Sequence, residues 1–152
     1  MKEPRGMRNN NPLNLRHGHS QWQGMKKEQT DKEFVCYMNK AYGYRAAWKV
    51  MNTYYSRFLR EGKAFTLSAI IHRWAPPEDG NDTTAYLHRV IQLTHLPGGQ
   101  PLPCPATTQG FETLSPVLSA MTCEECGIKP EAVPTDYIRR GFQLAFPHVK
   151  IE

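Results

Sequence analysis

The sequence contains no long apolar segment and no apolar leader. No run of its 152 residues approaches the roughly 18 apolar residues that a transmembrane helix requires. Residues 1–30 also lack the apolar centre of a secretory signal peptide. We therefore expect a chain that is made in the cytoplasm and does not insert into a membrane. Its four cysteines should then be free thiols.

The sequence signatures of common cofactor and metal sites are also missing. The chain has no phosphate-binding loop, no G-x-S-x-G, no H-E-x-x-H and no zinc-finger spacing. Cys123 and Cys126 form a C-x-x-C pair at the end of a predicted helix, whereas redox pairs use a helix N-terminus to lower the thiol pKa. Two cysteines also supply only half of a structural zinc site. We expect no metal and no cofactor.

Charge of one sign is never concentrated in the sequence. The 19 Lys and Arg residues and 14 Asp and Glu residues give a net charge of +5, which favours an anionic partner such as nucleic acid, a bacterial wall or a membrane surface. Because the basic residues are scattered, the continuous basic face of a nucleic-acid-binding module is not predicted. We expect no nucleic-acid partner.

Apolar spacing predicts a largely helical body in a single domain. Residues 41–62 repeat apolar side chains every three or four positions and form the strongest predicted helix. Thr66 caps a helix that Pro76 and Pro77 end, and Asp82 or Thr83 caps the next. The expected organisation is helices over 41–96, a Pro- and Gly-rich connector over 97–112, and C-terminal helices over 113–152, starting at Ser115-Pro116 and near Pro134-Thr135, with a stop at Gly127.

Residues 1–40 are expected to form a small β lobe. Short strands are predicted at 13–15, 21–23 and 34–38, joined by polar turns. Together with the helices, they predict an α+β fold that is mainly helical.

The N-terminal segment carries an unusual density of side-chain amides. It reads Arg5-Gly-Met-Arg-Asn-Asn-Asn-Pro-Leu-Asn-Leu15, an order with poor helix propensity and much hydrogen-bonding capacity. It is suited either to fixing an irregular backbone or to holding a polar ligand.

Two further segments have both a structural and a functional interpretation. Trp22 lies between Gln21 and Gln23 and either packs within a hairpin or stacks on a sugar ring. The segment 74–86 is either a capped loop or the rim of a cleft that carries Glu78, Asn81 and Tyr86.

These segments, with W-x-G over 22–24, D-x-x-F over 31–34 and the W-A-P-P and N-D-T groups of 74–83, resemble a phage and prophage family. Its members are often labelled virion structural protein P5-like and are common in Bacteroides-type genomes. The resemblance covers about residues 4–95 and implies no chemistry.

A second, weaker resemblance implies a reaction. The order of Asn-Leu, Trp-x-Gly and a Tyr-bearing helix is similar to lysozyme-like wall glucosaminidases of the flagellar type. Residues 118–132 resemble the Glu-Ser-Gly segment of lytic transglycosylases and goose-type lysozymes, with Glu125 at the position of the catalytic glutamate and Cys126 replacing Ser. We therefore expect a lysozyme-like fold in circularly permuted order, with the Glu125 helix beside the N-terminal asparagines.

This resemblance assigns chemistry to particular side chains. Glu125 at a helix C-terminus, beside Glu124, should have a raised pKa and act as general acid. A second carboxylate, needed unless a muramyl hydroxyl attacks internally, could be Asp31, Glu78 or Asp82. A solvated helix end is the structural alternative for Glu124 and Glu125. The candidate substrate-binding residues are Arg8, Asn9, Asn10, Asn11, Asn14, Trp22, Trp74, Asn81 and Tyr86.

The expected function is cleavage of the glycan strands of peptidoglycan, as a muramidase or lytic transglycosylase with an antibacterial action on the wall. The alternative is a non-catalytic phage virion or secreted protein that binds glycan. Either would reach the wall or periplasm by lysis, virion delivery or specialised secretion. The expected partners are peptidoglycan and an immunity or virion protein.

Overall fold

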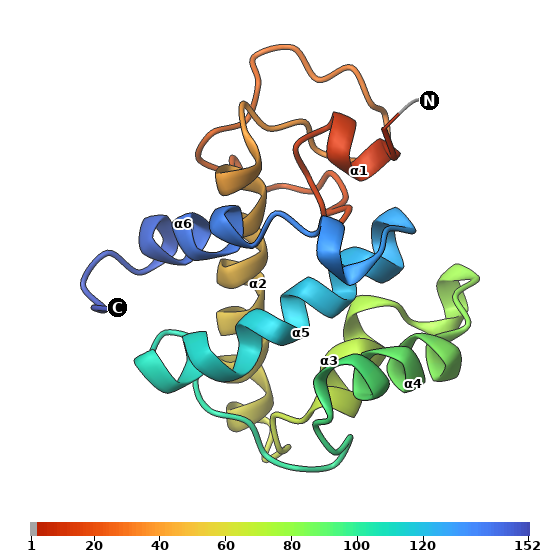
Figure 1. The fold of residues 1–152 in the computed structure, drawn as a ribbon, viewed down its shortest axis with the longest axis vertical. Coiled ribbons are helices and arrows are strands. Elements are labelled where there is room, and N and C mark those ends of the chain that lie inside the picture. The colour runs from red at the N-terminus through yellow and green to blue at the C-terminus, as the bar shows by residue number, and fades with distance from the viewer. Residues whose placement is uncertain (1–2) are drawn as a thin grey trace.

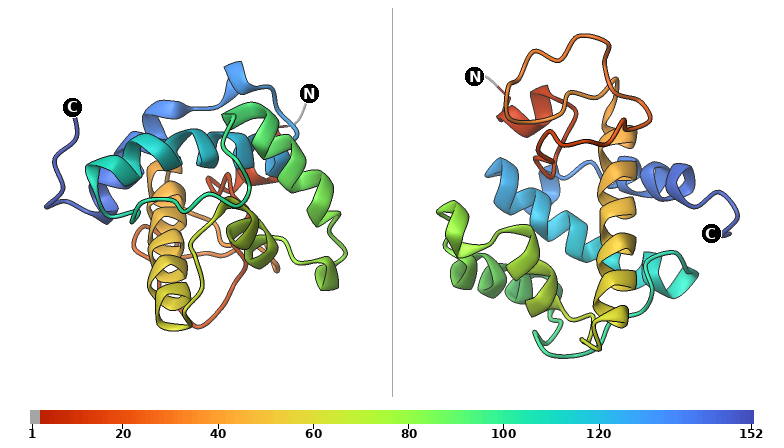
Figure 2. Two further views of the ribbon diagram at one scale, coloured as in Figure 1. Left: turned by 90° about the horizontal axis from the view of Figure 1, so that it is seen from below. Right: turned by 180° about the vertical axis from the view of Figure 1, so that it is seen from behind.

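The computed structural model describes residues 3–152, and in this range the regular elements are all helices (Figure 1). The long helix α2 is crossed by α5 and α6, while α4 packs against α5 and α3 packs against α4 (Figures 1 and 2). No helix among the described residues is both long and apolar enough to cross a bilayer. The elements are α1 (Arg5–Arg8), α2 (Lys40–Arg60), α3 (Leu67–Trp74), the 3-10 helix η1 (Pro77–Asp79), α4 (Thr83–Thr94), α5 (Thr108–Cys126), the 3-10 helix η2 (Pro130–Ala132) and α6 (Thr135–Ala145).

Local capping signals define most of the helix ends. The predicted caps are confirmed: Thr66 accepts from the backbone N–H of Ala69 at the start of α3, and Asp82 accepts from that of Ala85 at the start of α4. Gly127 ends α5 in the left-handed conformation, with φ of 64°.

Helix α5 begins earlier than the sequence pattern predicted. The Thr107 hydroxyl accepts from the N–H of Gly110 and caps the helix, so residues 108–112 are helical and not part of the connector. Pro116 then lies inside the helix and not in its first turn. The signal overlooked was the Thr107 cap, which follows the last proline of the connector.

The core is built where α2 meets α5 and α6. At Gly141 of α6, an added Cβ would lie 2.6 Å from the Cβ of Tyr44, so the two helices cross too closely for a larger residue. The buried Trp48 donates from Nε1 to the backbone oxygen of Ile138 (3.0 Å), and Tyr44 shares a hydrogen bond with the Thr122 hydroxyl (2.8 Å). The first two contacts hold α6 against α2, and the hydrogen bond to Thr122 ties α5, the helix that carries Glu125, to α2.

The expected α+β fold with an N-terminal β lobe is wrong. The predicted strands at 13–15, 21–23 and 34–38 are irregular chain, and the regular element within residues 3–39 is the short helix α1. The pairing that exists consists of isolated antiparallel bridges, Arg16 with Phe34 and Met25 with Tyr37. The lysozyme-like, permuted fold was expected from resemblances of the N-terminal segment and of residues 118–132, and the β lobe that it included is missing from the described residues.

Side-chain amides replace a strand ladder in this segment. Asn11 accepts from the N–H of Leu15 and donates to its carbonyl, both at 2.9 Å, and also donates to the carbonyl of Val35. Gln29 does the same for Cys36, at 2.7 and 2.8 Å. Because amide side chains satisfy both backbone groups of one residue, the chain needs no neighbouring strand there.

Candidate functional site

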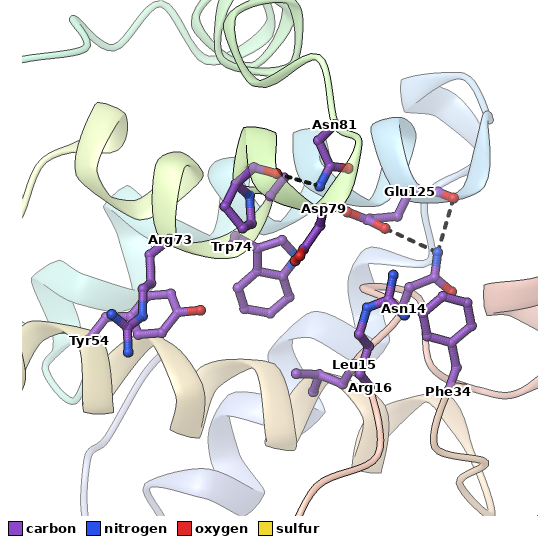
Figure 3. Close-up of a pocket in the computed structure, with 12 residues that line it drawn as sticks. Asn14, Leu15, Arg16, Phe34, Tyr54, Arg73, Trp74, Asp79, Asn81 and Glu125 are labelled. Carbon is purple, nitrogen blue, oxygen red and sulfur yellow. Dashed lines mark hydrogen bonds between the residues drawn. The ribbon is translucent and has the colours of Figure 1, made fainter. Parts of the chain in front are cut away.

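Glu125 lies in the last turn of α5 and lines a pocket of about 240 Å³, here called the Glu125 pocket (Figure 3). The pocket is formed between the N-terminal segment, α2, and the end of α3 with the loop that follows it. Its lining residues are Asn14, Leu15, Arg16, Phe34, Tyr54, Arg73, Trp74, Ala75, Pro76, Asp79, Asn81 and Glu125.

Two distant parts of the chain hold the Glu125 carboxylate. Asn14 donates from Nδ2 to Oε1 (3.1 Å) and to the backbone oxygen of Glu125 (3.2 Å), and the Tyr86 hydroxyl donates to Oε2 (3.0 Å). Asn14 adopts a left-handed backbone conformation with φ of 53°, which Asn tolerates better than most residues. The structure therefore brings the Glu125 helix and the asparagine segment into one site.

Burial is the main influence on the acidity of Glu125. Desolvation raises the pKa of its carboxyl, the charge of Glu124 raises it further, and hydrogen bonds from Asn14, Tyr86 and Trp74 oppose the shift. The net pKa is higher than that of an ordinary glutamate. Burial and the neighbouring Glu125 also raise the pKa of the Tyr86 hydroxyl well above its usual value, so it remains a donor.

The segment after α3 is both a capped loop and a pocket rim. Asp82 and Thr83 have structural roles, because Asp82 caps α4 and the buried Thr83 hydroxyl donates to the carbonyl of Ala75. Trp74, Asp79 and Asn81 line the pocket (Figure 3). Glu78 is exposed and does not line it.

Most of the predicted substrate-binding residues near the N-terminus shape the backbone. Asn9 donates to Asp31, Asn10 donates to the carbonyl of Tyr37, and Asn11 is fully buried in its contacts with Leu15 and Val35. Arg8 is exposed and donates to the carbonyl of Glu3. Asn14 is the member of this group that lines the pocket.

Asp31 belongs to a separate polar cluster, here called the Asp31 clasp. Arg5 donates to both of its carboxylate oxygens (2.6 and 2.7 Å), Asn9 donates to Oδ2 (2.9 Å), and the N–H groups of Glu33 and Phe34 donate to Oδ1. These donors hold the pKa of Asp31 well below its usual range. Asp31 does not line the Glu125 pocket.

Glu124 and Trp22 also lie outside the pocket. Glu124 forms an ion pair with Arg89 of α4. Trp22 packs against the cluster of Val35, Tyr37 and Ala46 and lines a different groove. Of the predicted site residues, the structure gathers Asn14, Trp74, Asn81, Tyr86 and Glu125.

Several pocket residues were missed by sequence reasoning. Asp79 lines the pocket where its neighbour Glu78 was expected, because the turn η1 directs the two side chains differently. Arg16 and Phe34 reach the pocket together through their backbone bridge, and Phe34 also lies against the guanidinium groups of Arg5 and Arg16. The D-x-x-F pattern was the available signal for Phe34.

Within residues 3–152, the cysteines and the other ligating side chains are not grouped as a metal site requires. The four cysteines are free, and burial raises the pKa of Cys126 to about 11, so it is a thiol that donates to the carbonyl of Pro12. Across the residues that the structure describes, no group of three or more His, Cys, Asp or Glu side chains is arranged to hold a metal ion.

Comparison with known proteins identifies the family but not the chemistry. No family model matches the chain. Protein P5 of Pseudoalteromonas phage PM2 is 35% identical over 145 residues, which cover 93% of this chain and 82% of the phage protein. The resemblance to P5-like phage proteins is thus confirmed, and the chain belongs to the family of protein P5 of phage PM2.

Proposed function

We propose that this protein cleaves the glycan strands of peptidoglycan, with Glu125 as the general acid. The observation that carries the proposal is a half-buried carboxyl of raised pKa in a polar pocket beside an indole ring. A carboxyl that stays protonated nearer neutral pH can deliver its proton to a glycosidic oxygen.

The other pocket residues suit a sugar substrate. Trp74 offers a ring on which the apolar face of a pyranose can stack. Asn14 and Asn81 place amides in the same pocket, although the Nδ2 group of Asn81 already donates to the carbonyl of Pro76. Amides are suited to hydrogen-bonding hydroxyl and acetamido groups, because each carries a donor and an acceptor.

Asp79 is the proposed second carboxylate. It lines the Glu125 pocket from the loop on the α3 side, whereas Glu125 comes from α5 (Figure 3). Glycosidases generally pair an acid with a second carboxylate that activates water or stabilises the sugar cation. Asp79 takes this role in place of Asp31, whose oxygens are occupied by Arg5, Asn9 and two backbone groups.

The proposal is tested by incubating the purified protein with peptidoglycan and measuring soluble muropeptides. Wild type should release them, and Glu125→Gln should lose about a hundredfold or more of the rate, the usual contribution of a general acid. Glu112→Gln is the matched control, since Glu112 is an exposed glutamate on the same helix and should leave the rate unchanged. No release by wild type from several wall types would contradict the proposal.

A second candidate is a non-catalytic phage virion or secreted protein that binds wall glycan. It is favoured by the internal hydrogen bonds to both Glu125 oxygens, because these bonds join α5 to α4 and to the N-terminal segment and give Glu125 a structural role. This candidate predicts that wild type and Glu125→Gln both bind peptidoglycan in a pull-down and that neither releases muropeptides.

A further inference from the structure

A second groove lies between the loop 20–23 and helix α2 and shares no lining residue with the Glu125 pocket. Its volume is about 700 Å³, and we name it the Trp22 groove. One wall comes from the loop 20–23 and the other from one face of α2, where residues at positions 45, 49, 52 and 53 are neighbours. Neither wall contains an acidic residue.

The groove carries two cations that have no carboxylate partner. Among the described residues, neither Arg45 nor Lys49 takes part in an ion pair. Lys49 lies over the ring of Phe146, with its nitrogen 5.4 Å from the ring centroid. In the Glu125 pocket, by contrast, Glu125 and Asp79 accompany the arginines. The Trp22 groove therefore has an uncompensated positive charge that suits an anionic ligand.

One buried polar atom of a groove residue, and one in the apolar cluster next to the groove, have no hydrogen-bond partner among the described residues. The Nε atom of Arg45, which lines the groove, is buried and makes no hydrogen bond. The same is true of the hydroxyl of Tyr37, a fully buried residue that does not line the groove but belongs to the apolar cluster against which Trp22 packs. Buried polar groups are normally paired, so an unpaired one is unusual in a folded protein. Because Arg45 lines the groove and has no ion-pair partner among the described residues, its guanidinium can bind an incoming carboxylate.

Packing against neighbouring apolar side chains fixes the position of Trp22. Its ring is half-buried against Val35, Tyr37 and Ala46, and its backbone N–H donates to the sulfur of Met25 (3.2 Å). The flanking Gln21 and Gln23 are exposed and supply amides on either side of the ring. An aromatic ring whose conformation is already fixed binds at a lower entropic cost than a mobile one.

We propose that the Trp22 groove is a second binding site for a carboxylate-bearing glycan, with Trp22 stacking on a sugar ring and Arg45 and Lys49 binding its carboxylates. Single-stranded nucleic acid is less well matched, because sites of that kind combine several rings with a longer basic track. The choice of wall glycan as ligand rests on the proposed function, whereas the binding site itself does not require Glu125 to be catalytic.

The test measures binding in the Glu125→Gln background, where the ligand is not cleaved. The probe is a soluble oligomer of N-acetylglucosamine and N-acetylmuramic acid with free carboxylates, and calorimetry gives affinity and stoichiometry. Trp22→Ala and Lys49→Gln should each weaken binding at one of two sites by about tenfold or more. A neutral chitin oligomer of equal length should bind the groove at least about tenfold more weakly than the acidic oligomer.

A matched variant separates the two sites. Trp74→Phe alters the Glu125 pocket and should leave the affinity of the Trp22 groove unchanged. Unchanged affinity and stoichiometry in Trp22→Ala and Lys49→Gln, with both variants folded by circular dichroism, would overturn the inference. Tighter binding of an oligothymidylate than of the glycan at this groove would also overturn it. Binding at the groove without muropeptide release by wild type would refute only the catalytic proposal.

Discussion

The Asp31 clasp and the Glu125 pocket place a carboxylate in opposite environments. Asp31 accepts hydrogen bonds from Arg5, Asn9 and two backbone N–H groups, and the pKa of Asp31 falls. Glu125 has no cation among its hydrogen-bond donors and is mainly desolvated, so the pKa of Glu125 rises. The comparison shows that the surroundings of a carboxylate, and not its presence in a polar motif, distinguish a structural anchor from a candidate acid.

The largest expected effect comes from removing the anchor. Asp31→Ala deprives Arg5, Asn9 and two backbone N–H groups of their acceptor and should lower the free energy of unfolding by about 2 kcal/mol. Most of this effect comes from lost hydrogen bonds, since Arg5 is exposed and its ion pair is screened. Urea denaturation measures it, with Glu28→Ala, an exposed residue of the same segment, as control.

The same variant has a pH signature with a defined sign. Because the folded-state pKa of Asp31 lies below the unfolded value of about 4, its stabilisation is complete above that value and is lost as pH falls toward the folded-state pKa. Wild type should therefore lose more stability than Asp31→Ala between about pH 5 and pH 2. Equal losses in the two proteins would show that the clasp does not form in solution.

A smaller effect is expected at the contact that joins the N-terminal segment to Glu125. Asn14→Ala removes the amide donor and places an alanine, whose Cβ is strained in the left-handed region, at φ of 53°. Asn14→Gly also removes the amide, but glycine has no Cβ and adopts this conformation without strain. The Ala variant should be less stable than the Gly variant by about 1 kcal/mol in urea denaturation. Both variants should raise the pKa of Glu125, since the amide favours the carboxylate. Equal stabilities would show that the backbone at residue 14 relaxes out of the left-handed region.

The sequence predicted the helical body well because local chemistry defines it. Apolar spacing located α2, and Thr66, Asp82 and Gly127 marked helix ends through hydrogen bonds and backbone conformation that involve only a few neighbouring residues. The β lobe was predicted incorrectly because alternating residues indicate a strand only if another strand pairs with it. Here Asn11 and Gln29 satisfy the backbone groups instead.

The site was predictable only in part for a related reason. Glu125 and Asn14 were identified from a resemblance that placed their segments together, and the structure shows them in contact. Trp22 was assigned to the site because a tryptophan between two glutamines suits sugar stacking, and Asp31 because a glycosidase needs a second carboxylate, but neither lines the pocket. Their separation from the pocket depends on how the irregular segment turns between residues 15 and 37, and no local pattern encodes that path.

The most direct test of the account is a carbon-13 NMR titration of the side-chain carboxyl groups, with Glu125→Gln and Asp31→Asn used for assignment. Glu125 should titrate above the ordinary glutamate value of about 4.3. Asp31 should remain ionised well below the ordinary aspartate value of about 3.9. A Glu125 carboxyl that titrates at or below the ordinary glutamate value would contradict its role as a protonated acid in the pocket.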